Sequence, residues 1–137
     1  MDSILPTLKQ GLPVLIEQFL ATLVLLGIGI GCYMLITPFD ERRLIREGNP
    51  AAGIVVAGTL VALALPLAVR LASSVVLLDI VVWGIVALLI QLLTFVAVTA
   101  TMRGLRGMIE AGNVAAALVL IGIQIAVALL NAGATAG

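Results

Sequence analysis

A few polar side chains interrupt long apolar stretches of this chain. The deepest are Thr59, Gln91, Thr94 and Gln124. An amide buried in lipid must find a hydrogen-bond partner. We expect that partner to be a neighbouring helix, with a polar track for an ion or small solute as the alternative. A carboxylate often marks an ion path, and we find none at the same depth in the sequence.

Two matched asparagines, Asn49 and Asn113, each follow a glycine and a short run that contains arginines. An asparagine oxygen can accept from the free N–H groups that begin a helix, and Pro50 suits the first helical position. We therefore predict two helix caps. Capping does not exclude an anion or headgroup site at these helix starts. The residues predicted to contact lipid or a partner are Arg42, Arg43, Arg46, Asn49, Arg103, Arg106 and Asn113.

Three charged residues, Glu17, Arg70 and Asp79, should lie near the non-cytoplasmic ends of their helices. Long charged side chains at such positions usually extend into the headgroups, and we favour that interpretation. The alternative is an ion pair between Arg70 and Asp79, which would hold the turn between the two halves. We expect Trp83 to anchor at the non-cytoplasmic interface and Tyr33 to lie near the cytoplasmic one.

Several classes of chemistry are excluded by residue content. Histidine is absent, and Cys32 is the single cysteine, so one chain can form no disulfide, zinc site or Cys-His or Ser-His catalytic pair. The formal net charge is zero, which argues against nucleic acid as a partner. We predict a non-enzymatic protein that has no catalytic residue and needs no metal or cofactor.

The elements that carry these residues are long and apolar. Hydrophobic residues make up 63% of the 137-residue chain and charged residues 10%, against roughly 45–50% and about 25% in soluble domains. Four apolar stretches each hold at least 18 residues, enough for a helix to cross a hydrocarbon core of about 30 Å. They are residues 13–37, 50–72, 77–102 and 114–131. The sequence predicts an all-α integral membrane protein with four transmembrane helices.

The segments between these helices are short. Hydrophobic residues alternate with charges in 38–48 and in 103–112, so we expect short helices that lie on the membrane. Five of the seven Lys/Arg residues are in these two loops, which the positive-inside rule places in the cytoplasm. Both termini of a four-helix chain then lie on the other side. Residues 73–76 link the two halves.

The chain contains an internal repeat. Residues 45–52 and 109–116 both contain the order Gly-Asn-x-Ala-Ala, at an offset of 64 residues. We expect one membrane domain, 1–137, made of two repeats at 13–72 and 77–132. Two helices return each repeat to its starting side, so the two copies should be parallel.

Small residues recur four apart. Such spacings place small side chains on one helix face and let neighbouring backbones approach closely. We expect packing within the chain rather than a dedicated dimer motif, although one face can serve both. The pairs are Gly27 with Gly31, Gly58 with Ala62, and Gly122 with Ala126.

Several segments carry a resemblance to a known family. They are Ile36-Thr37-Pro38, residues 44–52, Gly58-Thr59-Leu60, Leu65-Pro66-Leu67, Trp83-Gly84 running to Phe95, and Leu130-Asn131-Ala132. In these the chain resembles the YjfL-like family of small bacterial inner-membrane proteins, a domain of unknown function numbered 350. The resemblance implies a duplicated two-helix membrane domain and no catalytic residues. It also implies, by association, a link to envelope maintenance and to peripheral membrane-remodelling proteins.

The functional expectation follows from where the charge lies. We expect a self-associating inner-membrane protein that presents basic cytoplasmic loops to lipid headgroups or to a peripheral partner. The alternative is a small oligomeric channel or carrier for an ion or small solute, built around the four deep polar residues. Four helices enclose little space, so such a pore would need several subunits.

Overall fold

The computed structural model describes residues 4–74 and 76–136 and is helical nearly throughout. Long apolar runs fold as helices in lipid because a helix closes its backbone hydrogen bonds internally. Four of the helices in the described residues are long and apolar enough to cross a membrane, which confirms the predicted fold class at that level. The helices are α1 (Ile4–Ile36), α2 (Glu41–Arg46), α3 (Pro50–Ser73), α4 (Leu77–Thr101), α5 (Leu105–Glu110) and α6 (Val114–Thr135).

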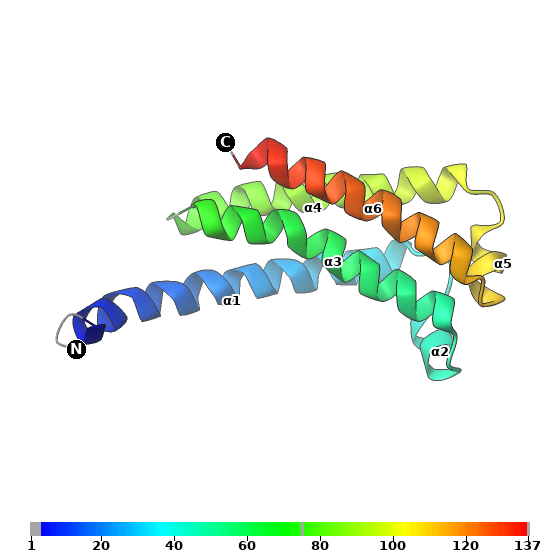
Figure 1. Cartoon of the computed structure of the whole chain (residues 1–137), viewed down its shortest axis with the longest axis horizontal. Coiled ribbons are helices and arrows are strands. Elements are labelled where there is room, and N and C mark those ends of the chain that lie inside the picture. Colours follow the sequence, from blue (N-terminus) through cyan, green and yellow to red (C-terminus); the bar gives the residue numbers. More distant parts are fainter. Residues whose placement is uncertain (1–3, 75, 137) are drawn as a thin grey trace.

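The four long helices lie side by side, and the two short helices lie together at one end of the bundle (Figure 1). Both termini and the link between α3 and α4 lie at the opposite end. Val75 in this link falls outside the described residues, as do residues 1–3 and 137. The closest pair of helices is α3 and α6. The short helices at 41–46 and 105–110 confirm the predicted loop helices.

Helix α1 begins earlier than predicted. The sequence suggested a start at Pro13, whereas the helix begins at Ile4 and contains Pro13 in its interior. Proline there removes only one backbone hydrogen bond, and the apolar residues on both sides continue the helix. The 33 residues of α1 reach about 50 Å at 1.5 Å per residue. That exceeds a hydrocarbon core of about 30 Å, and the N-terminal turns of α1 extend past the other helices (Figure 1).

The other three long helices begin at the predicted residues Pro50, Leu77 and Val114. Caps explain two of these starts. The Asn49 side chain accepts from the Ala52 amide, and the Asn113 side chain accepts from the Ala116 amide. Helix α4 begins without a side-chain cap and depends on its apolar sequence alone.

Small residues let two helix pairs approach closely. A Cβ added at Gly58 of α3 would lie 2.5 Å from Ile121 Cβ of α6, and one added at Gly29 of α1 would lie 2.7 Å from Leu88 Cδ2 of α4. The predicted packing role is therefore right for Gly58. It is wrong for Gly27, Gly31 and Gly122, which are exposed, and an added Cβ there would meet nothing within 4 Å. Ala126 is exposed as well.

The core near α2 and α5 contains an aromatic pair. The rings of Tyr33 and Phe95 meet edge to face, with their centroids 4.7 Å apart. Leu44 of α2 and Leu105 and Ile109 of α5 are buried against the same cluster. Each short helix is thus fixed to the bundle by apolar side chains, while its charged residues other than Glu41 of α2 stay exposed.

Candidate functional site

The surface formed by α2, α5 and the turn before α5 holds most of the basic residues. Its five arginines are all exposed: Arg42, Arg43, Arg46, Arg103 and Arg106. Leu44, Leu105 and Ile109 point the other way and are buried. Asp40 caps α2 by accepting from the Arg43 amide over 3.3 Å. We call the five exposed arginine side chains the arginine surface.

Acidic neighbours neutralise part of the arginine surface. Arg106 pairs with Glu110 at 2.7 Å, and Arg43 lies 3.8 Å from Glu47. Among the described residues, the other three arginines make no ion pair within 4 Å. They are Arg42, Arg46 and Arg103. The surface therefore retains unpaired positive charge toward the solvent or the headgroups.

The two short helices end in the same way. Gly48 and Gly112 both have φ of 80°, a left-handed conformation that favours glycine. The Gly48 amide donates to Ile45 O and the Asn49 amide to Leu44 O, both over 2.9 Å. The matching bonds after α5 have the same lengths. This pattern is the Schellman C-cap, so each loop ends one helix and caps the next within two residues.

Asn49 and Asn113 differ beyond their caps. The Asn49 amide nitrogen donates to Ile109 O over 2.8 Å and to Glu110 O over 3.2 Å. In the described part of the chain, the Asn113 side chain makes a single hydrogen bond, in which its oxygen accepts from the Ala116 amide. Asn49 therefore fastens the start of α3 to the end of α5, and its side chain is already occupied. Asn113 is exposed, and its side-chain amide nitrogen has no hydrogen bond to another described residue.

The deep polar residues fall into separate groups. The Gln91 amide of α4 donates to Gln124 O of α6 over 3.2 Å. The Asn131 amide of α6 donates to Gln91 Oε1 and to Ala87 O, each over 3.3 Å. All three polar side chains are buried. The Gln91 and Asn131 side chains join α4 to α6 in the way expected of interhelical hydrogen bonds. Gln124 contributes its backbone carbonyl, and its Nε2 atom, like Asn131 Oδ1, has no hydrogen-bond partner within the described residues.

Thr94 and Thr59 lie apart from that group. The Thr94 hydroxyl donates to Ile90 O within its own helix. Thr59 of α3 is buried beside Tyr33 of α1. The four residues proposed for a polar track are therefore not one continuous line.

A second buried polar group lies near the arginine surface. Tyr33, Glu41 and Thr59 are each at most 3% exposed. Tyr33 Oη, Glu41 Oε1 and Thr59 Oγ1 are fully buried and have no hydrogen-bond partner within the described residues. The polar side chains that act on the Tyr33 hydroxyl are those of Thr59, Glu41 and Thr37.

The charged residues at the opposite end form a partly buried ion pair. Arg70 Nη1 lies 3.3 Å from Asp79 Oδ2, and Ser74 Oγ donates to the same oxygen over 2.6 Å. Arg70 Nη2 also donates to Thr135 O. The Arg70 guanidinium lies 5.7 Å from the centre of the Trp83 ring. The alternative of an Arg70–Asp79 pair is thus the arrangement present, in place of simple extension into headgroups.

Two other sequence expectations concern the helix ends. Glu17 is exposed on α1 and makes no ion pair within 4 Å among the described residues, which agrees with extension toward the headgroups. Tyr33 lies in the last turn of α1, but its side chain is 0% exposed and packs on Phe95. Trp83 remains half-exposed beside Arg70, as an interfacial residue should be.

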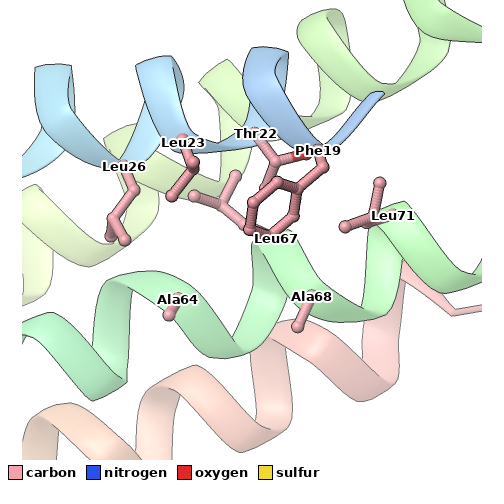
Figure 2. Close-up of a pocket in the computed structure, with 8 residues that line it drawn as sticks. All are labelled: Phe19, Thr22, Leu23, Leu26, Ala64, Leu67, Ala68 and Leu71. Atoms are coloured by element: carbon pink, nitrogen blue, oxygen red, sulfur yellow. The ribbon is translucent and has the colours of Figure 1, made fainter. Parts of the chain in front are cut away.

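An apolar groove of about 190 Å³ runs between α1 and α3. Figure 2 shows Phe19 of α1 and Leu67 of α3 reaching toward each other across it. The Thr22 hydroxyl in the groove is already bonded to Gln18 O. The lining offers no free polar group, so the groove suits a lipid acyl chain. Its residues are Phe19, Thr22, Leu23, Leu26, Ala64, Leu67, Ala68 and Leu71.

Sequence reasoning missed Glu41 and Asn131 as site residues. Glu41 was grouped with the loop charges, although it precedes the buried Leu44 by three residues and so shares its helix face. Asn131 follows Gln124 by seven residues, which places both on one face of α6. Helical spacing was the available signal for both residues.

Comparison with known proteins agrees with the membrane architecture. The family described as "Domain of Unknown Function (DUF350)" matches residues 7–135. The UPF0719 inner membrane protein YjfL of Escherichia coli strain K12 is 36% identical over 100 residues, which cover 73% of this chain and 76% of that protein. Its counterpart in Escherichia coli O157:H7 shows the same values. No solved structure matches. The chain therefore belongs to the DUF350 family and is an inner membrane protein.

Proposed function

We propose that this protein is a non-enzymatic inner-membrane protein whose arginine surface binds anionic lipid headgroups at the cytoplasmic face. One observation carries the proposal. Five exposed arginines are held at one end of the bundle by short helices whose apolar sides are buried. A basic residue close to an anionic membrane contributes about 1 kcal/mol of attraction. Arg42, Arg46 and Arg103 are the leading contributors because they have no acidic partner within 4 Å in the described residues.

The cytoplasmic placement of this surface follows from the positive-inside rule. With four candidate spans and with α2 and α5 at one shared end of the bundle, this orientation predicts that both termini lie in the periplasm. A C-terminal alkaline phosphatase fusion should be active, and a C-terminal green fluorescent protein fusion should be dark. A fluorescent C-terminal fusion would contradict this orientation.

Lipid recovery tests the headgroup interaction. The change is the triple variant Arg42→Gln, Arg46→Gln and Arg103→Gln, purified in mild detergent beside the unchanged protein. We expect several-fold less phosphatidylglycerol and cardiolipin to copurify, because the unpaired charges are gone. Lys9→Gln is the matched control, since it removes a cation from exposed α1 at the opposite end of the bundle. Equal anionic lipid in all three preparations would contradict the proposal.

A peripheral partner protein is the competing ligand for the same surface. The arginine surface would suit an acidic protein that itself sits on the membrane, such as a membrane-remodelling coat. Crosslinking in intact cells, from a photoreactive residue at the exposed position 43, distinguishes the two. A specific protein adduct that disappears in the triple variant, with unchanged lipid recovery, would favour the partner.

Self-association is proposed from the exposed glycines. Gly27 and Gly31 of α1 and Gly122 of α6 present flat, small faces at the lipid-exposed surface. Such faces allow close contact between helices of two copies. Light scattering in detergent should give more than one copy of the protein per particle. Gly122→Leu or Gly27→Leu should reduce the number of copies per particle. A particle of one copy for the unchanged protein would contradict this part of the proposal.

We also propose that residues 13–72 and 77–132 are two parallel repeats. The matched loops support this. Gly48 with Asn49 and Gly112 with Asn113 make the same set of backbone and capping bonds at an offset of 64 residues. Coexpressed halves that assemble into a folded protein would support two independent units, and failure of every split at the 73–76 link would contradict them.

A further inference from the structure

Three polar side chains each have a fully buried oxygen atom that makes no hydrogen bond of normal geometry within the described residues. These atoms belong to the Tyr33 phenol, the Glu41 carboxyl and the Thr59 hydroxyl. The Thr59 hydroxyl lies within weak hydrogen-bonding range of the Tyr33 hydroxyl, and the Glu41 carboxylate is close enough to interact with it electrostatically. The three side chains come from three helices, α1, α2 and α3, so tertiary packing brings them together. Buried polar atoms are normally satisfied, and leaving even one unpaired costs about 1–3 kcal/mol. Such a group calls for a ligand that all three oxygens can share.

Glu41 makes the requirement stronger. Its side chain is 3% exposed, and no Lys or Arg of the described residues lies within 4 Å of its carboxylate. A buried carboxylate without a positive partner is much more costly than a buried hydroxyl. The neighbouring arginines do not meet this need, because Arg42 and Arg43 are exposed and point away from the core.

The surroundings favour a cation. Tyr33 lies in the last turn of α1, which ends at Ile36, and the C-terminal end of a helix carries partial negative charge. Asp40, whose carboxylate caps α2, precedes Glu41. A hollow of about 360 Å³ at the surface is lined by Asp40, Glu41 and Arg42 together with Met34 and Leu35 of α1. Of the three side chains, Glu41 is the one that borders this hollow.

We propose that Tyr33, Glu41 and Thr59 form a binding site for one sodium ion. The donors are all oxygens, which hard cations prefer, and the single carboxylate matches a single positive charge. A divalent ion of the same preference normally takes more than one carboxylate or keeps several waters. Membrane proteins also bind Na⁺ where a helix ends and its carbonyl groups become available. The ion would tie α2 to α1 and α3 beneath the arginine surface.

The site does not depend on lipid binding by the arginine surface. Neutralising Arg42, Arg46 and Arg103 removes exposed charge and leaves the three buried oxygens in place. The two ideas can therefore fail separately.

Sodium-dependent stability is the first test. The full chain is purified in detergent, and its unfolding temperature is compared in NaCl, KCl and choline chloride at equal ionic strength. We expect NaCl to raise Tm by several degrees in a saturable way, because a ligand that binds only the folded state stabilises it. Choline chloride should have no such effect, and equal Tm values in NaCl and choline chloride would overturn the proposal.

Matched variants connect the effect to the site. Glu41→Gln and Thr59→Val should lose the sodium response. Glu47→Gln and Thr94→Val change the same residue types outside the site, since Glu47 is exposed and Thr94 bonds within its own helix. These two should keep the response. A response that survives in Glu41→Gln would overturn the proposal.

Direct binding covers the case in which Glu41→Gln fails to fold. Radioactive sodium should bind the unchanged protein in a saturable way at about one ion per chain, and Thr59→Val should weaken that binding several-fold. Absence of saturable binding would overturn the proposal.

Discussion

The side-chain amide of Asn49 donates a hydrogen bond to the backbone carbonyl of Ile109 over 2.8 Å. The two residues are 60 positions apart in the chain, so this contact joins the loop of the first half to that of the second. Asn49 also caps α3 through its oxygen, with 3.1 Å between Oδ1 and the Ala52 amide. One small side chain thus satisfies an orphan donor of one helix and an orphan acceptor of another.

Asn49→Asp tests the second of these contacts. Aspartate caps a helix as well as asparagine does, but it has no amide donor and turns a negative charge toward the carbonyls of Ile109 and Glu110. We expect a loss of about 1–3 kcal/mol, measured by unfolding in detergent. Asn113→Asp is the matched control and should change stability by less than about 0.5 kcal/mol. Equal losses of stability in the two variants would mean that the Asn49 amide adds nothing beyond the capping that both residues provide.

Gly58→Ala tests the close approach of α3 and α6. The new methyl group would lie 2.5 Å from Ile121 Cβ, so the helices must move apart. Overpacking of this kind typically costs about 1–3 kcal/mol. Gly122→Ala, the equivalent change in the second half, faces open space and should be neutral or slightly stabilising. Gly58→Ala should cost less in the background of Ile121→Gly, which removes the clashing Cβ, and a smaller loss there would show that the clash is the cause.

Asn131→Leu tests the buried amide group between α4 and α6. The change removes the donor to Gln91 Oε1 and to Ala87 O. Hydrogen bonds between transmembrane helices contribute about 0.6 kcal/mol on average and up to about 1.7 kcal/mol. We expect a loss in that range, and a double-mutant cycle with Gln91→Leu should show coupling of the same size. Additive losses would mean that the two side chains do not stabilise each other.

Much of the scaffold could be predicted from the sequence because lipid imposes simple rules. The length of the apolar runs predicted the four spans. The cap residues predicted two helix starts that are confirmed by the structure, at Asn49 with Pro50 and at Asn113. The start of α1 was predicted too late, because residues 4–12 include Pro6, Lys9, Gln10 and Gly11 and are less apolar than the residues after Pro13, yet the helix continues through them. The positions of cap residues were therefore more predictable than the ends of apolar runs.

The polar clusters were less predictable because they depend on which helix faces meet. Gly58 packs on Ile121 while Gly122, at the same repeat position, faces outward. The sequence alone does not distinguish Gly58 from Gly122. Glu41 likewise reads as one loop charge among several, and only the docking of α2 places its carboxylate beside Tyr33. Which helix faces contact each other depends on tertiary packing, so it cannot be inferred from the local sequence pattern.

Arg70 and Asp79 offer the last test, since their pair joins α3 to α4 across the link between the halves. The Arg70 side chain is 14% exposed and the Asp79 side chain 37% exposed, so solvent screens the pair only in part. Arg70 also donates to Thr135 O of α6 and lies over the Trp83 ring. Removing Arg70 should therefore cost more than removing Asp79, because only Arg70 contacts the end of α6.

We expect Arg70→Ala to lower unfolding stability more than Asp79→Ala, and a double-mutant cycle to give coupling of up to about 1 kcal/mol. High salt should shrink this coupling, because Asp79 is partly exposed. Arg106→Ala with Glu110→Ala is the matched control, an exposed pair within one short helix, and it should show less coupling, about 0.3–0.5 kcal/mol. Zero coupling for Arg70 and Asp79 would mean that the contacts of Arg70 with α6 and Trp83, rather than the ion pair, hold this end of the bundle together.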